Sequence, residues 1–169
     1  MEYSGKRKRG LLAVFAFAAS VTWLSCAGAP STAQILQDWR VDCASGVCNA
    51  SQTVAAEDGT WLATVRLYAG ETAPTSDEVL GEILVPSGVH LASGLYLGFG
   101  ERMIDAAWQR CTAEMCRAAL AFDDGMLGAW RRGAASEVRY RPGPDAPVIA
   151  FDVSLMGLTD ALAALEAGR

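Results

Sequence analysis

The residues of this sequence best suited to chemistry are four cysteines, which form two pairs with the same spacing. Four residues separate Cys43 from Cys48, and four separate Cys111 from Cys116. In an oxidising compartment four cysteines form two disulfides, with three possible connectivities. We favour the local pairing, Cys43 with Cys48 and Cys111 with Cys116, because each pair is flanked by segments that alternate apolar and polar residues, as hairpin strands do.

Two other uses of these thiols fit the sequence less well. Four thiolates suit a structural zinc ion in a reducing or metal-controlled setting, whereas the leader pattern of residues 1–33 described below predicts an oxidising one. A thioredoxin-like redox pair has two residues between its cysteines at the start of a helix, whereas each pair here has four. We therefore predict structural disulfides, with no metal and no cofactor.

His90 is the only histidine, so any Ser-His-Asp triad or histidine metal site would have to use it. It follows a Pro-Ser-Gly turn, and no Gly-x-Ser-x-Gly motif marks a nucleophile. The sequence also lacks carboxylates with catalytic or calcium-binding spacing and a glycine loop suited to phosphate. These features predict a non-enzymatic protein without catalytic residues, and a hydrolase that uses His90 is the minor alternative.

A short stretch in the second half of the chain is basic, although the whole chain carries a net charge of −5. An acidic balance argues against a nucleic-acid-binding surface, which needs a concentrated positive field. The basic stretch is most simply a solvated turn and strand face, and the alternative is a docking patch for an anionic partner. Its residues are Arg131, Arg132, Arg139 and Arg141.

The first 33 residues have the three-part pattern of a secretory signal peptide. A basic segment at residues 6–9 precedes an apolar run at 11–24, which is shorter than the roughly 20 residues that span a bilayer. We expect residues 1–33 to be removed and residues 34–169 to form the exported domain, in the periplasm or at the cell surface. Loss of the leader removes four basic residues and Glu2, so the net charge falls from −5 to −8.

Cys26 offers an alternative to simple cleavage of the leader. It lies in the stretch Trp23-Leu24-Ser25-Cys26, which is similar to the modification site of a lipoprotein. Such signals usually carry a leucine three residues before the cysteine, whereas Leu24 is two before it. We favour cleavage after Ala33, and lipidation of Cys26 is the alternative that would attach the protein to the outer membrane.

Short strands are the elements that must position these residues. Alternating runs of about five to eight residues recur with Gly and Pro turns between them. About eight strands of this kind indicate an all-β antiparallel sandwich or barrel, because the long helices of a parallel α/β sheet are missing between them. Besides the cysteine hairpins, the predicted strands cover residues 61–68, 81–85, 95–99, 103–110, 137–141 and 148–153.

Two short helices are predicted among the strands, each with an apolar stripe that we expect to cover the core. For the first, Asp123 or Asp124 is the cap, and for the second, Thr159 or Asp160 is the cap. The first stripe consists of Met126, Leu127 and Trp130, and the second of Leu158, Leu162 and Leu165.

Four motifs in order along the chain carry a resemblance to a known family. They are Trp39-Arg40-Val41-x-Cys43, the run Ile83-Leu84-Val85-Pro86-Ser87-Gly88-Val89-x-Leu91, Arg110-Cys111 with Cys116, and Val153-Ser154-Leu155-x-Gly157-Leu158. With these motifs the domain resembles the invasion-associated locus B family of exported bacterial proteins over essentially its whole length. The resemblance implies an immunoglobulin-like β-sandwich at the periplasm or cell surface, with no catalytic residues to carry over.

The residues and the resemblance together predict what kind of protein this is. We expect an exported, non-enzymatic envelope or surface protein that binds a protein or a host-cell surface component. The alternative is a periplasmic housekeeping or stress accessory protein with no host role.

Overall fold

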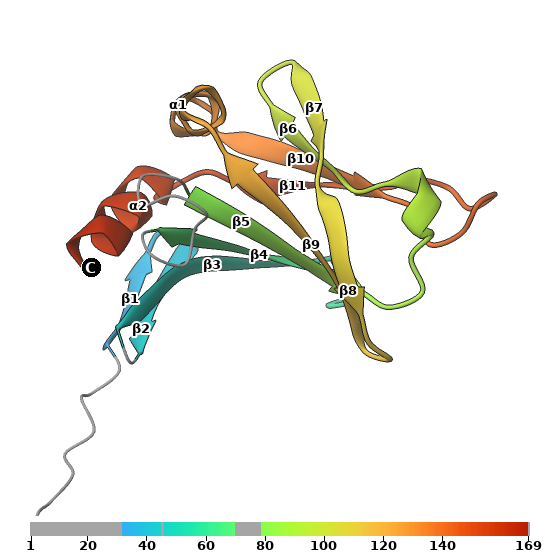
Figure 1. Ribbon diagram of the computed structural model, residues 1–169, viewed down its shortest axis with the longest axis horizontal. Helices are drawn as coiled ribbons and strands as arrows, with labels where there is room; N and C mark the ends of the chain where they lie inside the picture. Colours follow the sequence, from blue (N-terminus) through green and yellow to red (C-terminus); the bar gives the residue numbers. More distant parts are fainter. Residues whose placement is uncertain (1–31, 45, 70–78, 169) are drawn as a thin grey trace, which may run out of the picture.

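The structure is a computed structural model that describes residues 32–44, 46–69 and 79–168. These residues form two antiparallel sheets with two α-helices packed beside them (Figure 1). The all-β class predicted from the alternating pattern is confirmed, with eleven strands in the described ranges. The elements are β1 (Thr32–Leu36), β2 (Trp39–Ala44), β3 (Val47–Ala55), β4 (Trp61–Ala69), β5 (Val79–Pro86), the 3-10 helix η1 (Leu91–Ser93), β6 (Tyr96–Phe99), β7 (Arg102–Asp105), β8 (Ala107–Cys111), β9 (Met115–Phe122), α1 (Asp124–Arg132), β10 (Ala135–Tyr140), β11 (Ile149–Ser154) and α2 (Leu158–Ala167).

The first sheet has seven strands in the order β1-β2-β3-β4-β5-β9-β8, and the second has four in the order β11-β10-β6-β7. From β1 to β5 the chain runs as a meander, so each strand pairs with the next one along the sequence. In β4 the residues Ala63, Val65 and Leu67 are buried, whereas the side chain of Arg66 is exposed to solvent. The alternation predicted for residues 61–68 is therefore confirmed.

The core lies between the inward faces of the two sheets. Val65 and Ile83 of the first sheet and Leu97 and Val138 of the second are fully buried members of one hydrophobic cluster. Both helices add to this cluster, since α2 packs against β1, β2, β3 and β4 while α1 packs against β6 and β9. Figure 1 shows the helices side by side at the end of the molecule where β1 and β2 lie.

Residues 103–110, predicted as one strand, belong to two strands in different sheets. β7 pairs with β6 in the second sheet, and β8 pairs with β9 in the first. The change occurs at Ala106, which is fully buried and whose N–H donates to the carbonyl oxygen of Leu95 at 2.8 Å. The prediction was wrong here because alternation describes the faces of a strand and not the neighbour with which it pairs.

The first helix begins as the sequence predicts. Of the two candidate aspartates, Asp123 is the cap, because its Oδ1 accepts a hydrogen bond from the backbone N–H of Met126 at 2.7 Å. The buried face of α1 carries Leu127 and Trp130. The Trp130 ring stacks on Phe99, with 5.3 Å between the ring centroids, so α1 joins the aromatic part of the core.

The predicted caps of the second helix, Thr159 and Asp160, are wrong. α2 begins after Gly157, which has a φ of 86° and provides no side-chain cap. Glycine is needed there because a Cβ would collide with the carbonyl oxygen of Leu36, so the turn between β1 and β2 sets the start of the helix. The predicted stripe is buried as expected, at Leu158, Leu162 and Leu165.

Both cysteine pairs form the local disulfides that the spacing predicts. Cys43 is bonded to Cys48 across the β2–β3 hairpin, and Cys111 to Cys116 across the β8–β9 hairpin. In each hairpin the two cysteines are direct register partners beside the turn. Gly46 has a φ of 80° in the first turn, a conformation that glycine adopts without steric cost.

The two disulfides have different surroundings. The end of α2 lies directly on the first one, since a Cβ at Gly168 would stand only 3.2 Å from the sulfur of Cys43. The second disulfide lies beside a hairpin turn, where Cys111 is exposed, Cys116 is buried in the core, and the N–H of Thr112 donates to the carbonyl oxygen of Met115 at 2.8 Å. The β2–β3 and β8–β9 hairpins, although similar in spacing, therefore pack differently.

The buried side-chain amide of Gln52 connects the two sheets at one edge through hydrogen bonds. Gln52 of β3 is only 7% exposed, and its Nε2 donates to the carbonyl oxygens of Asp38 at 3.1 Å and Ser154 at 3.3 Å. Its Oε1 accepts from the N–H of Ser154, which ends β11, at 2.8 Å. Trp39 Nε1 also donates to the carbonyl oxygen of Ser154, at 3.1 Å. Polar side chains of the first sheet thus complete the backbone hydrogen bonding of the second.

Most of the predicted signal peptide, including Cys26, lies outside the described residues. Its last two residues, Thr32 and Ala33, begin β1 and pair with Cys43 and Asp42. Neither α-helix of the described ranges is long and apolar enough to cross a membrane.

Candidate functional site

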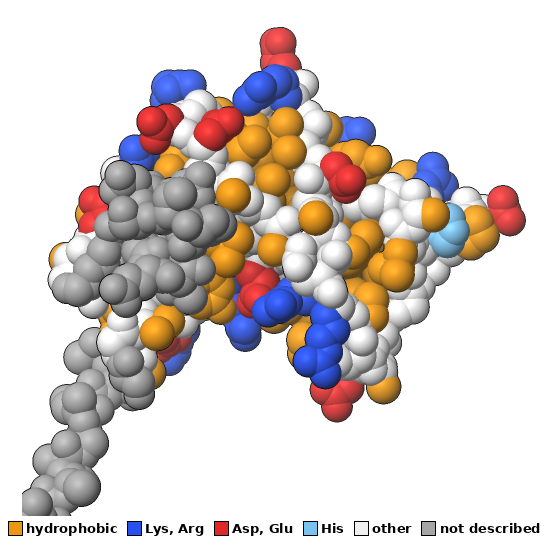
Figure 2. Space-filling model, in the orientation of Figure 1, with side chains coloured by type: hydrophobic (Ala, Val, Ile, Leu, Met, Phe, Trp, Pro, Cys, Tyr) orange, Lys and Arg blue, Asp and Glu red, His pale blue; other side chains and the backbone are white. Residues whose placement is uncertain are grey.

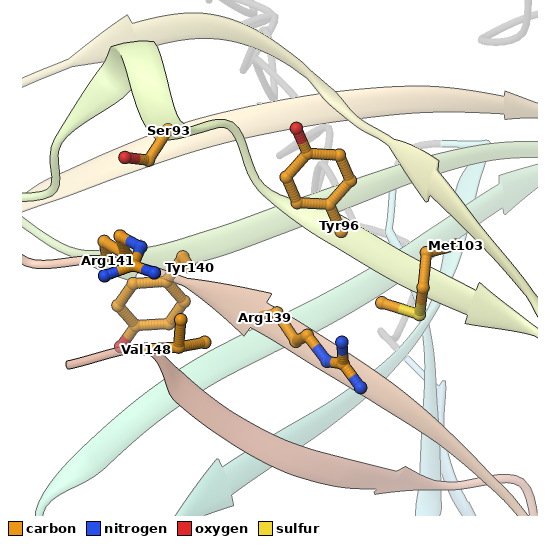
Figure 3. A pocket seen from close by; sticks show the side chains of 7 residues that line it. All are labelled: Ser93, Tyr96, Met103, Arg139, Tyr140, Arg141 and Val148. Atoms are coloured by element: carbon orange, nitrogen blue, oxygen red, sulfur yellow. The ribbon is translucent and has the colours of Figure 1, made fainter.

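The most promising site is a groove of about 340 Å³ on the outer side of the four-stranded sheet. Figure 3 shows Tyr96 and Met103, from β6 and β7, on one side of it and the side chains of β10 on the other. The β10–β11 connection closes one end, and η1 lies above that end. The lining residues are Ser93, Tyr96, Met103, Arg139, Tyr140, Arg141 and Val148.

Strand alternation in β10 accounts for the charged wall of the groove. Val138 and Tyr140 are buried toward the core, so Arg139 between them faces outward. Tyr96 of β6 is the direct register partner of Arg139 and is 38% exposed. Because register partners point to the same face of a sheet, the phenol ring and the guanidinium become neighbours.

The two arginines of the groove are held by contacts on one side only. Arg139 pairs through Nε with Glu137, two residues earlier on the same face of β10. Arg141 donates from Nη1 to the carbonyl oxygen of Ala146 across the β10–β11 connection, at 2.6 Å. Since a guanidinium carries five N–H donors, both arginines keep donors for a ligand in the groove.

Tyr140 forms the buried part of the groove wall. Its hydroxyl donates to the carbonyl oxygen of Leu62 in the first sheet at 3.1 Å. Burial raises the pKa of Tyr140 above the ordinary value of 10.0, because the phenolate would lose its hydration. Tyr140 is therefore a neutral, rigid part of the site at physiological pH.

A second hollow of about 270 Å³ continues the groove toward α1, and Met103 and Arg139 line both. Its floor includes Gly98, whose carbonyl oxygen accepts from Trp130 Nε1 at 2.8 Å and from Ser136 Oγ at 2.7 Å. A Cβ at Gly98 would stand 3.3 Å from the backbone nitrogen of Glu137. Close packing of β6 against β10 therefore keeps this part of the surface free of a side chain.

His90 takes part in holding η1 above the groove. Its N–H donates to the carbonyl oxygen of Arg141 at 2.8 Å, and its Nδ1 is 2.8 Å from the hydroxyl of Ser93. A Ser-His contact is part of a nucleophile–base arrangement. No hydrogen bond in the described ranges joins His90 to a carboxylate that would orient it. The contact's evident role is to link both ends of the η1 turn, where the N–H of Ser93 also donates to the carbonyl oxygen of His90.

The four arginines of the predicted patch fall into two pairs. Arg139 and Arg141 line the groove, whereas Arg131 and Arg132 form the exposed last turn of α1. β10 lies between the pairs, and its six residues span about 20 Å at 3.3 Å per residue. The first pair lines the groove together with aromatic rings and apolar side chains, so it is the pair suited to a ligand.

Sequence reasoning missed the apolar members of the groove. Tyr96 and Val148 are among the exposed large hydrophobic residues, at 38% and 44%. Tyr96 carries one usable signal, since it alternates with Leu95 and Leu97 and so must face outward. Val148 and Met103 carry none, because only the pairing of β6 with β7 and β10 brings their elements together.

Within the part of the chain that the structure describes, no three His, Cys, Asp or Glu side chains are arranged to hold a metal ion. The groove instead combines two aromatic rings, one thioether and two guanidinium groups. Such a set binds by stacking, apolar contact and charge-assisted hydrogen bonds.

Comparison with known proteins identifies a matching family model, two relatives and a similar crystal structure. Residues 24–166 match the family model described as Invasion associated locus B (IalB) protein. The chain is 26% identical over 159 residues to invasion protein B homologs of Brucella abortus strain 2308 and of biovar 1 strain 9-941, covering 93% of this chain and 90% of each relative. It is similar to the crystal structure of invasion associated protein B from Bartonella henselae, with a TM-score of 0.71, 20% identity, and coverage of 81% of this chain and 97% of that one.

Proposed function

This chain belongs to the invasion-associated locus B family, and we propose that it is an exported protein that acts by binding a partner at the bacterial envelope or on a host-cell surface. The printed names of its relatives link them to invasion. Export is supported by the two disulfides, because such bonds persist in oxidising compartments outside the cytoplasm.

The groove on the four-stranded sheet is the observation that carries the binding proposal. Tyrosine, methionine and arginine are enriched at protein interfaces, and tyrosine and arginine dominate binding energy there. Tyr96, Met103, Arg139 and Arg141 line the groove together. Sheet pairing fixes the positions of Tyr96 and Arg139, so the partner meets a surface that is already ordered.

The same residues indicate the chemistry of the partner. A carboxylate or sulfate on the partner would accept hydrogen bonds from Arg139 and Arg141, and an apolar group beside it would contact Tyr96 and Val148. We therefore propose a partner that presents an acidic group next to an apolar one, such as a surface protein with an acidic segment.

Binding to isolated membranes tests the proposal. Labelled, oxidised protein is titrated onto envelope fractions and onto host-cell membranes, and the double variant Arg139→Gln/Arg141→Gln is compared with Arg131→Gln/Arg132→Gln. The two variants change the net charge equally. We expect the groove variant to bind at least tenfold more weakly and the helix variant to bind as the parent does.

Two other results are informative in this titration. Equal binding by all three proteins would disprove a role for the groove. Saturable binding to envelope fractions with none to host membranes would favour an envelope accessory protein over a host-binding one.

Export is tested at the amino terminus of the protein in the bacterium. We propose cleavage before Gln34, with lipidation of Cys26 as the alternative, so mass spectrometry should find an unmodified chain that begins at Gln34. A diacylated chain that begins at Cys26 would establish the lipoprotein. A chain that retains residues 1–25 in the cytoplasm would contradict export.

A further inference from the structure

A second arginine cluster lies on the outer face of the seven-stranded sheet, away from the groove. Arg110 of β8 and Arg117 of β9 are direct register partners, so two positive side chains stand opposite each other. Like charges in this position destabilise a sheet. Arg117 is compensated by Glu82, with 2.9 Å between Nη1 and Oε1, whereas Arg110 forms no ion pair with any carboxylate that the structure describes.

A β-bulge is what turns Arg110 toward this face. In a regular strand Arg110 would share a face with Trp108, two residues earlier. Trp108 is partly buried against the core, opposite the fully buried Ala118. The register shifts between Trp108 and Arg110, and the extra residue reverses the direction of the side chains that follow. The strand thus departs from regular pairing and places a second arginine beside the first.

Glu82 holds the neighbouring arginines in place. Its side chain is only 11% exposed, and it lies between Arg66 of β4, at 3.6 Å, and Arg117 of β9, at 2.9 Å. One carboxylate therefore pairs with two guanidinium groups, and because Arg110 stands opposite Arg117 the cluster has a surplus of positive charge. In Figure 2 arginine side chains gather beside the β8–β9 hairpin, although the domain as a whole is acidic.

A hollow of about 280 Å³ lies at the arginine pair. Arg110, Arg117 and Thr112 line it together with Leu84 and Met115. Leu84 is 6% exposed and Met115 is partly buried, so the cationic pair stands next to an apolar floor. Two guanidinium groups next to each other match the oxygens of one tetrahedral dianion, and they would lose their mutual repulsion on binding it.

We propose that Arg110 and Arg117 form a binding site for a phosphate monoester group. The apolar floor suits a phosphate carried on an amphiphilic molecule such as a lipid. Glu82 is a positioning residue, since it pairs with Nη1 of Arg117 and leaves the other N–H donors of that guanidinium to the ligand. This site is independent of the groove on the other sheet.

The test measures binding of two phosphate sources by the oxidised protein. In one arm the midpoint of thermal unfolding is measured at increasing concentrations of inorganic phosphate, with chloride at equal ionic strength as the reference. In the other arm vesicles of phosphatidylcholine with phosphatidic acid are compared with vesicles of phosphatidylcholine alone. The variants are Arg110→Gln and, as the matched control, Arg40→Gln, which removes the same charge from a residue paired with Asp42.

We expect phosphate binding in at least one arm, weakened tenfold or more in Arg110→Gln and retained in Arg40→Gln. Binding in the first arm alone identifies free phosphate as the source, and binding in the second identifies the lipid-borne group. No binding in either arm would overturn the proposal, as would equal losses in the two variants.

The stability of Arg110→Gln in the absence of phosphate distinguishes a binding role of Arg110 from a structural one. Because Arg110→Gln removes a repulsive pair, its unfolding midpoint in phosphate-free buffer should equal or exceed that of the parent. Phosphate should then raise the midpoint of the parent and leave that of the variant unchanged. A midpoint well below the parent's in phosphate-free buffer would show that Arg110 supports the fold, and would overturn the assignment.

Discussion

Tyr140 shows how one side chain serves both the core and the surface. Its ring meets Phe151 edge-on, with 6.2 Å between the centroids, while its hydroxyl donates to Leu62 of the opposite sheet. The same burial that fixes the groove wall disfavours the phenolate and raises the pKa of Tyr140. Burial, followed by the negative charge of Glu82, raises the pKa of Tyr68 on the other sheet as well.

These shifts predict loss of stability at alkaline pH. A phenol whose pKa is higher in the folded state binds more protons there than in the unfolded chain between the two pKa values. The contribution of Tyr140 to the free energy of unfolding should therefore be complete below pH 10 and fall as the pH rises through its folded pKa. Urea unfolding from pH 7 to 11 should show this decline, and it should be shallower in Tyr140→Phe. An equally steep decline in both proteins would refute the assignment.

The two hairpins show at the scale of elements that one motif can have two roles. Each disulfide closes a loop of the same length and therefore lowers the entropy of the unfolded chain equally. This loss of entropy adds about 2 kcal/mol to the free energy of unfolding for each disulfide. The folded surroundings differ, because the end of α2 rests on Cys43 and Cys48, whereas Cys116 is buried in the core between the sheets and Cys111 is exposed. Any difference in stability between their variants must therefore arise in the folded state.

Paired serine variants test this difference. Cys111→Ser/Cys116→Ser and Cys43→Ser/Cys48→Ser should each lower the free energy of unfolding by at least about 2 kcal/mol, the loop-entropy value. Only Cys43→Ser/Cys48→Ser also removes the packing beneath α2. Hydrogen exchange in α2 should rise only in the second variant. Equal losses, with α2 equally protected in both, would show that the helix does not depend on the disulfide.

At the scale of the whole molecule, the connections between the two sheets contribute to the free energy of unfolding. The chain crosses from one sheet to the other at Ala106, and the Gln52 amide joins β3 to the end of β11. Without Gln52 the N–H of Ser154 would lose its partner inside the protein. A buried donor left unpaired costs about 1–3 kcal/mol.

The substitution Gln52→Ala measures this connection. We expect the free energy of unfolding to fall by about 1–3 kcal/mol. Thr53→Ala is the control, because Thr53 is the exposed neighbour and surface substitutions change stability by about 0.5 kcal/mol or less. Both values come from chemical denaturation at pH 7. A loss in Gln52→Ala no larger than that of the control would mean that water satisfies Ser154 and that the amide is dispensable.

The features that the sequence predicted correctly depend on residues close together in the chain. Four residues between cysteines determine a local disulfide, alternation determines which face of β4 is buried, and Asp123 caps a helix that begins at the next residue. In each case the interacting groups lie within a few residues of each other, so spacing alone specifies the contact.

The tertiary structure decided the features that depend on strands far apart in sequence. Gly157 starts α2 because Leu36 lies against it, and Tyr96 meets Arg139 because β6 pairs with β10. Neighbours in sequence misled the prediction, since Arg131 ends α1, before β10 begins, whereas Arg139 lies near the far end of β10. Arg110 and Arg117 went unnoticed for another reason: they belong to one hairpin, but the alternation of β8 does not reveal the bulge that turns Arg110 toward Arg117. Which side chains meet across strands that are far apart in sequence is set by strand order and register, and no local pattern encodes either.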